Sequence, residues 1–198
     1  RGKPRCNVES PVTTESNSVS RVCVDTGPGR EVYTYMYMPK TPAQDQNIGM
    51  YLSGYADGEG SFCVSFSPRP KLKARIEVRP SFSVSQNGDR REVLDLFLEY
   101  FHCGTIRKNP SDKTYKYEVR SLNDLLEKII PHFQAFPLLS SKQKDFFKFE
   151  TICGLMKQRM HKTHLGLQKI VDIAYTMNSS GTRKYTKEFL LHLIFVKI

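Results

Sequence analysis

The alternating pattern between residues 61 and 84 constrains the fold of this chain more than any other sequence feature. Apolar and polar residues alternate over 61–67 and again over 73–84, and the segment PRPKLK separates the two runs. An alternation with a period of two is typical of β-strands that bury one face and expose the other. The pattern therefore predicts a long β-hairpin with one apolar face and one polar face.

Helical segments surround this hairpin. We expect a helix to begin at Thr41-Pro42, because proline is favoured at the first helical position, and to end in the segment ADGEG. The chain continues with a helix at 89–102, strands at 104–108 and 114–120, and helices at 122–130, 141–159, 163–176 and 186–196, the last four separated by Pro131, Pro137 and the loop 178–181. This order predicts an α+β fold in which helices cover one face of a four-stranded antiparallel sheet.

The first 45 residues differ in composition from the rest of the chain. They are rich in Ser, Thr, Pro and Gly and show little periodicity, although the run VYTYMYM at 32–38 offers apolar side chains that would hold part of the segment in place. We therefore predict an N-terminal extension at 1–45 and one domain at 46–198.

The charge of the chain points to a polyanionic partner. Lys and Arg number 30 against 20 Asp and Glu, a net charge of +10. Nucleic acid is the first candidate and an anionic membrane the second. The membrane is disfavoured because no apolar run reaches the roughly 18 residues of a spanning helix, and because the basic residues do not follow one amphipathic helix.

The cysteines and the N-terminus favour an intracellular protein. The five cysteines are odd in number, widely spaced and without a CxxC pair, which fits a reducing compartment. The first residues lack an apolar signal-peptide core, and Glu9, Glu15 and Asp25 argue against an acid-poor transit peptide.

The polar face of the hairpin is the first candidate site. Its outward positions combine cations with hydroxyl groups: Ser65, Ser67, Arg69, Lys71, Lys73, Arg75, Glu77, Arg79, Ser81 and Ser83, to which the second hairpin adds Arg107, Asn109 and Lys116. A solvated face can also look charged, and that alternative stays open. Only one acid interrupts the run, however, and a twisted antiparallel ribbon fits the major groove of DNA.

The segment ADGEG is the second candidate site. Asp57 and Glu59 lie at a helix C-terminus, where the partial negative charge disfavours acids. A divalent cation held by Glu59 and the carbonyl of Gly58 would explain the acids, since hard cations take oxygen ligands. Alternatively, Gly58 and Gly60 only end the helix and Glu59 is a solvated turn residue.

The segment LSGYADGEGSF (52–62) resembles the LAGLIDADG motif of homing endonucleases, with four of nine letters identical in L-S-G-Y-A-D-G-E-G. The segments FSVSQNGDRR (82–91), SKQK (141–144) and GTRK (181–184) resemble those of the single-motif, intron-encoded enzymes, so the likeness spans about 46–196. It implies an α-ββ-α-ββ-α core with the sheet curved into a saddle.

The resemblance also implies roles for individual residues. Glu59 stands where the family has its metal-binding carboxylate, beside the Gly58 carbonyl, and Gln86, Arg90 and Lys142 stand where the outer active site lies. The implied cofactor is Mg²⁺, for which Mn²⁺ or Ca²⁺ can substitute. Phosphodiester hydrolysis needs an activated water and positive charge near the phosphate, which these residue types provide. Lys142 is a cation two residues after a Ser140 cap, at a helix start that prefers anions, and a bound phosphate would resolve that conflict.

One motif per chain implies a homodimer on double-stranded DNA with a pseudo-palindromic site. Gly54 and Gly58 share one helical face and would let two copies approach, with Leu52 and Tyr55 completing the interface, unless packing within one chain explains the glycines. The resemblance suggests a chloroplast, a mitochondrion or a bacterial cytoplasm. A maturase-like RNA-binding protein and a non-catalytic DNA-binding regulator on the same fold remain alternatives.

Overall fold

The computed structural model describes residues 21–25, 31–35, 42–111, 113–178 and 181–195. The chain divides into two compact units, Arg1–Ile48 and Gly49–Ile198. In the first unit, β1 (Arg21–Asp25) and β2 (Glu31–Tyr35) pair in an antiparallel two-stranded sheet. Part of the VYTYMYM run therefore forms a strand, whereas Thr41 lies outside the described residues.

A four-stranded antiparallel sheet forms the centre of the second unit, in the order β3-β4-β6-β5. The long hairpin consists of β3 (Gly60–Pro68) and β4 (Ile76–Asn87), and the short one of β5 (Thr105–Lys108) and β6 (Thr114–Val119). β4 pairs with β6, with Phe82 opposite Val119, and so joins the two hairpins.

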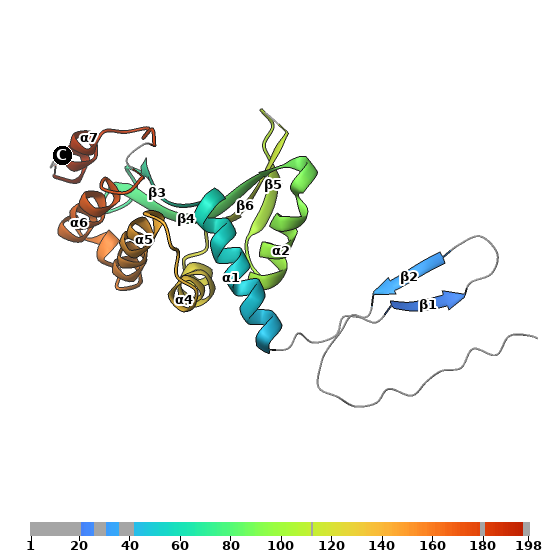
Figure 1. The fold of residues 1–198 in the computed structure, drawn as a ribbon. Coiled ribbons are helices and arrows are strands. Elements are labelled where there is room, and N and C mark those ends of the chain that lie inside the picture. Colours follow the sequence, from blue (N-terminus) through green and yellow to red (C-terminus); the bar gives the residue numbers. More distant parts are fainter. Residues whose placement is uncertain (1–20, 26–30, 36–41, 112, 179–180, 196–198) are drawn as a thin grey trace, which may run out of the picture. The chain divides into compact units, whose positions relative to one another are not determined.

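Helices cover one face of this sheet (Figure 1). Their bounds are α1 (Pro42–Glu59), η1 (Gly88–Arg90), α2 (Glu92–Phe101), α3 (Leu122–Asp124), η2 (Leu125–Ile129), α4 (Ile130–Ala135), α5 (Lys142–Lys157), η3 (Met160–Lys162), α6 (His164–Ala174) and α7 (Lys187–Phe195). The predicted α+β fold with its α-ββ-α-ββ-α order is confirmed. Among the described residues, no helix has the length and apolar character needed to cross a membrane.

Aromatic side chains fill the space between the sheet and the helices. The ring of Phe62 on β3 lies 5.1 Å from Phe82 on β4, 5.2 Å from Phe133 on α4 and 5.4 Å from Phe146 on α5, measured between ring centroids. All four rings are fully buried, and each such burial stabilises the fold by about 1.5–3 kcal/mol. The inward positions of the predicted hairpin therefore form the core.

The turn of the long hairpin is wider than its pattern predicts. The alternation places Lys73, Ala74 and Arg75 in a strand, but β4 begins only at Ile76. The backbone N–H groups of Leu72 and Arg75 donate to the carbonyls of Arg69 and Leu72, both at 2.9 Å, and Arg75 takes a left-handed conformation with φ 57°. These bonds form a turn over 69–75, where the alternation predicts a strand from Lys73 onward.

The expectation that Pro131 separates two helices is wrong. One helical run continues from Leu122 to Ala135 through α3, η2 and α4. The wide π-helical turn of η2 precedes Pro131, which then lies in the first turn of α4, where a backbone N–H needs no partner within the helix.

Contacts between α1 and the region of α4 fix the helix that carries the ADGEG segment. Ser53 donates its hydroxyl to the carbonyl of Phe136 at 2.7 Å, and its oxygen lies 3.1 Å from Nε2 of His132. Burial lowers the pKa of His132 to about 4, so the imidazole is neutral at physiological pH. A Cβ on Gly49 would lie 2.6 Å from the Phe136 ring, so a larger residue there would have to displace this ring.

Candidate active site and nucleic-acid interface

The end of α1 carries two acids in the last turn. Glu59 is the last residue of the helix and its side chain is exposed, whereas Asp57 is half-buried. A Cβ on Gly60 would lie 2.6 Å from the carbonyl oxygen of Ala56, so only glycine permits the abrupt change from α1 into β3. The chain therefore presents Asp57 and Glu59 together with the last carbonyls of α1.

Asp57 binds the segment that precedes α5. Its carboxylate accepts hydrogen bonds from the backbone N–H groups of Leu139 at 3.0 Å and Ser140 at 2.8 Å, and from the Ser140 hydroxyl. Burial raises the pKa of Asp57, but these hydrogen bonds and the charge of Lys142 outweigh it and hold the pKa below its ordinary value. An acid at the unfavourable end of α1 is thus stabilised at the start of α5.

Lys142 makes the reciprocal contact. It is the first residue of α5, and its Nζ donates to the carbonyl oxygens of Ala56 at 3.0 Å and Gly58 at 3.2 Å, at the negative end of α1. Burial lowers the pKa of Lys142, and the charges of Asp57 and Glu59 offset only part of that shift. Lys142 lies at a helix start that disfavours cations, but the carbonyls at the end of α1 stabilise its charge. No bound phosphate is needed to explain a lysine at this position.

The cap of α5 also differs from the expectation by one residue. Ser141 occupies the N-cap position and makes no side-chain cap. The hydroxyl of Ser140 nevertheless accepts a hydrogen bond from the backbone N–H of Lys142 at 3.1 Å.

Gln86 approaches the same end of α1 from the sheet. Its side-chain amide donates to the hydroxyl of Tyr55, one turn before Glu59. Arg90 lies on the exposed turn η1. Within the described part of the chain, no hydrogen bond or ion pair joins Arg90 to Glu59, Gln86 or Lys142. Hydrogen bonds therefore tie Gln86 and Lys142 to the helix end that carries Glu59, whereas among the described residues none ties Arg90 to it.

The oxygen atoms at this helix end suit a hard divalent cation. The carboxylate of Glu59 and the carbonyl of Gly58 are neighbours, and both residues are exposed. The described residues contain no group of three or more His, Cys, Asp or Glu that could hold a metal on its own. Mg²⁺ keeps several waters and takes one or two carboxylates together with substrate phosphates, so such a sparse set of protein ligands fits it.

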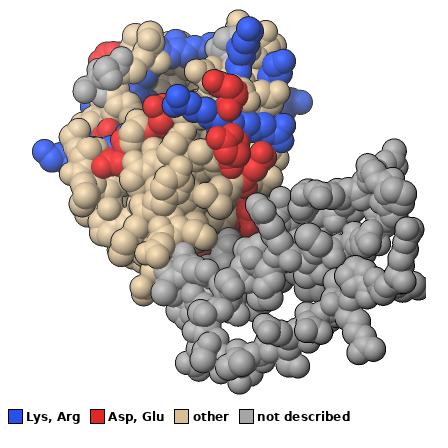
Figure 2. Space-filling view, turned by 45° about the vertical axis from the view of Figure 1, so that its right-hand side comes forward, with Lys and Arg blue, Asp and Glu red and all other residues tan. Residues whose placement is uncertain are grey.

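The polar face of the sheet carries the predicted DNA-binding residues. The strand register places Ser65 opposite Arg79 and Ser67 opposite Glu77 on the long hairpin, and Arg107 opposite Lys116 on the short one. Figure 2 shows Lys and Arg side chains gathered over the upper part of the described surface, with Asp and Glu mainly below them.

Glu77 links two arginines of this face. Its carboxylate lies 2.9 Å from Nε of Arg69 and 2.8 Å from a terminal nitrogen of Arg79, and all three side chains are at least one-third exposed. Hydrogen bonds from Arg79 and Arg69 hold the pKa of Glu77 below its ordinary value. Exposed ion pairs of this kind are individually weak. Glu77 therefore orients the side chains of Arg69 and Arg79 but does not hold them tightly.

Two residues of the predicted interface have other roles. Ser83 is only 4% exposed, because it lies in the middle of the sheet between Ser61 on β3 and the buried Glu118 on β6. The side-chain oxygen of Asn109 accepts a hydrogen bond from the Ser111 hydroxyl at 2.9 Å and so closes the turn of the short hairpin. The remaining predicted positions are at least partly exposed: Ser65, Ser67, Arg69, Lys71, Lys73, Arg75, Glu77, Arg79, Ser81, Arg107 and Lys116.

One face of α1 is open between Tyr51 and Gly58. A Cβ on Gly54 or on Gly58 would meet nothing within 4 Å among the described residues, and Tyr51 on the same face is 50% exposed. Packing within the described part of the chain therefore does not explain these two glycines. The expectation for Leu52 is corrected: it is fully buried in the chain's own core and cannot face a second copy.

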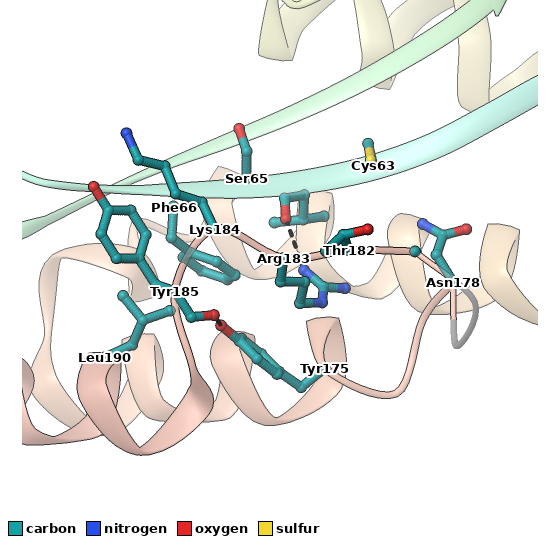
Figure 3. A pocket seen from close by; sticks show the side chains of 12 residues that line it. Cys63, Ser65, Phe66, Tyr175, Asn178, Thr182, Arg183, Lys184, Tyr185 and Leu190 are labelled. Atoms are coloured by element: carbon teal, nitrogen blue, oxygen red, sulfur yellow. Dashed lines mark hydrogen bonds between the residues drawn. The ribbon is translucent and has the colours of Figure 1, made fainter.

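The segment that contains GTRK lies against the edge of β3 (Figure 3). Arg183 donates to the carbonyl of Val64 at 3.3 Å, and its guanidinium lies 4.6 Å from the ring centroid of Tyr175. The side-chain amide of Asn178 donates to the carbonyl of Phe62 at 2.8 Å. These side chains satisfy carbonyls that the open edge of the sheet would otherwise expose.

The sequence model of the LAGLIDADG endonucleases matches residues 52–153. This chain belongs to the LAGLIDADG endonuclease family. It is 32% identical to a probable intron-encoded endonuclease of Neurospora crassa over 148 residues, which are 74% of this chain and 32% of that protein. It spans between a quarter and a third of the length of this and two further relatives from Neurospora crassa and Podospora anserina.

Solved structures of homing endonucleases share the fold of this chain. The homing endonuclease I-TnaI is 33% identical, with a TM-score of 0.65 over 73% of this chain and 94% of that one. The archaeal intron-encoded homing endonuclease I-Vdi141I, complexed with DNA, is 29% identical, with a TM-score of 0.69 over 76% of this chain and 95% of that one.

The sequence does not identify two further residues of this helix end. It shows Asp57 only as an acid at the unfavourable end of α1, and Ser140 only as a candidate cap of α5. The sequence does contain a signal for this contact, because α1 ends with acids and α5 begins with a lysine. The acids suit the partly positive start of α5, and the lysine suits the partly negative end of α1.

Proposed function

We propose that this chain is a sequence-specific DNA endonuclease that cuts both strands of a double-stranded target as a homodimer, with divalent metal ions. The observation that carries the proposal is the meeting of Glu59, the Gly58 carbonyl and the Lys142 ammonium at the end of α1, with Lys142 Nζ 3.2 Å from the Gly58 oxygen. The membership of the LAGLIDADG endonuclease family supports it.

Glu59 and the Gly58 carbonyl would hold Mg²⁺, and Mn²⁺ or Ca²⁺ would occupy the same oxygen ligands. A metal bound there supplies an activated water and neutralises charge on the phosphate. In hydrolysis, the water oxygen bonds to phosphorus, the bond from phosphorus to the leaving oxygen breaks, and the leaving oxygen takes up a proton. Lys142 would stabilise charge on that phosphate, and Gln86 would orient water without competing for its proton.

Arg90 would act differently from these residues. It lies on an exposed turn four residues after Gln86, so its guanidinium is free to reach the phosphate only when DNA is bound. We therefore assign Arg90 to charge stabilisation in the complex.

The polar face of the sheet would read the target. Arg and Lys form paired hydrogen bonds with guanine in the major groove, and serine hydroxyls can serve other base edges. The arginines ordered by Glu77 are the strongest candidates for such contacts.

The open face of α1 would form the dimer interface. Tyr51, Gly54, Tyr55 and Gly58 lie on one side of the helix, and close approach of two helices requires small residues there. Pairing would place one Glu59 near each scissile phosphate and require a pseudo-palindromic target. The names of the relatives support an intron-encoded protein, for which we propose an organelle or a prokaryotic cytoplasm as the location.

The direct test is incubation with a library of long DNA duplexes and Mg²⁺, followed by sequencing of the ends produced. The proposal predicts double-strand ends at one related set of sites, and no ends in EDTA. Binding to the library without any cutting would instead support a DNA-binding regulator, and binding only to structured RNA would support a splicing cofactor.

A further inference from the structure

A closed set of hydrogen bonds joins the end of α1 to the start of α5. We name it the helix-end ring, made of Asp57, Ser140, Lys142 and the carbonyls of Ala56 and Gly58. The carboxylate of Asp57 binds Ser140 through its backbone N–H and its hydroxyl, and the same hydroxyl accepts the backbone N–H of Lys142. The Nζ of Lys142 then returns to the carbonyls on either side of Asp57.

The ring fixes a lysine that would otherwise move freely. Lysine carries its charge on a flexible four-carbon stem and loses rotamer entropy when it is held in place. The start of α5 would also repel the ammonium, because the first amides of a helix carry partial positive charge. Asp57 opposes both effects, since it binds the segment before α5 and adds a negative charge close to the amine.

We propose that Asp57 is a positioning residue for cleavage, which holds the first turn of α5 against the end of α1 and thereby places the Lys142 ammonium beside the Gly58 carbonyl. This inference rests on the proposed nuclease function, in which Lys142 contacts the phosphate. Asp57 itself lies on the ring and does not reach the reacting atoms. Its effect on the rate therefore passes through Lys142.

A double-mutant cycle tests this dependence. We expect Asp57→Asn to lower the single-turnover cleavage rate constant by about tenfold to a hundredfold, because a displacement of about 1 Å can have that effect. The dissociation constant for the same DNA without Mg²⁺ should change less than about twofold. Combined with Lys142→Met, Asp57→Asn should lower the rate no further, since coupled residues are not additive.

Two further variants keep the test decisive. Ser140→Ala retains the Asp57 carboxylate but removes the hydroxyl between it and Lys142, and it should lower the rate by about threefold to tenfold. If Asp57→Asn does not fold, Ser140→Ala tests the same proposal. Asp172→Asn is the matched control. Asp172 forms an ion pair with Lys187, with 2.8 Å between the charged atoms, and is not part of the helix-end ring. The cleavage rate of Asp172→Asn should equal that of the wild type.

Hydrogen exchange separates failure of this inference from failure of the proposed function. Asp57→Asn should accelerate exchange of the Leu139 and Ser140 amides whether or not the chain cuts DNA. An inactive wild type would refute the nuclease, with the exchange result still deciding whether the ring exists. An active wild type with unchanged rates in Asp57→Asn and Ser140→Ala, or an equal loss in the Lys142→Met background, would overturn the positioning role.

Discussion

At the end of α1, charged side chains are held by the main chain, whereas on the polar face of the sheet they are held by each other. Asp57 accepts two backbone N–H groups and Lys142 donates to two backbone carbonyls. Arg69 and Arg79, by contrast, share the partly exposed carboxylate of Glu77. Hydrogen bonds to the main chain fix the position of a side chain, whereas a side chain in an exposed ion pair can easily change partners.

Under the proposed function, this difference would separate two tasks in one chain. Chemistry on a phosphate requires groups placed to within a fraction of an ångström, which suits the helix-end ring. Recognition of base edges requires side chains that can leave one partner for another, which suits the arginines beside Glu77. Substitutions in the first region should therefore change the rate of cutting, and substitutions in the second should change the choice of sequence.

The largest effect is expected for Glu59→Gln. Loss of the carboxylate would remove the metal ligand, and the cleavage rate should fall by at least about a thousandfold, since metal-ion catalysis contributes several kcal/mol. DNA binding should stay within about threefold by gel shift without metal. Glu127→Gln, at an exposed acid of η2, is the control. Equal cutting by Glu59→Gln in Mg²⁺ would refute the site.

Lys142→Met should come next. A single stabilising group contributes about a hundredfold to such a rate, whereas DNA affinity should change by less than about threefold. Lys157→Met, an exposed lysine at the far end of α5, provides the comparison in single-turnover cleavage and binding assays. If Lys142→Met lowers DNA affinity more than it lowers the cleavage rate, Lys142 contacts the DNA backbone. The end of α1 and the polar face of the sheet would then not differ in function.

Arg79→Ala should alter sequence choice. If Arg79 pairs with a guanine, preference at one or two base pairs should relax by about tenfold, measured by cleavage of a panel of single-base variants of the target. Arg75→Ala, in the turn of the hairpin, should act in the same way at a more distant base pair. A uniform loss across the whole panel would identify phosphate contacts instead.

Glu77→Gln should have the smallest effect. Freed from their shared acid, Arg69 and Arg79 should bind unrelated DNA about threefold more tightly at low salt, with a steeper salt dependence. The rate of cutting at saturating DNA should not change. A change in that rate would show that the polar face takes part in catalysis.

The sequence predicts those parts of the molecule that depend on local pattern. The alternation from Phe62 to Val84 determines which strand positions enter the core, and the segment ADGEG marks the end of α1. The conformation of Arg75 depends on hydrogen bonds within a turn, and the position of Pro131 inside a helical run depends on a wide π-helical turn. Hydrophobic periodicity predicts neither feature.

The helix-end ring was less predictable still. Asp57 and Ser140 are 83 residues apart in the chain, and only the folded sheet brings their helices together. For the same reason the pattern could not show that Leu52 faces the core of its own chain, or that Ser83 is covered by the strands on both sides.

Mixed dimers test whether each of two chains supplies the site for one DNA strand. Wild-type chain and an equal amount of Glu59→Gln, refolded together, should form dimers with one active site, which convert supercoiled plasmid carrying the target into nicked circles. Nicked circles should accumulate from the mixture and not from either protein alone. Linear product without an excess of nicked circles would contradict it.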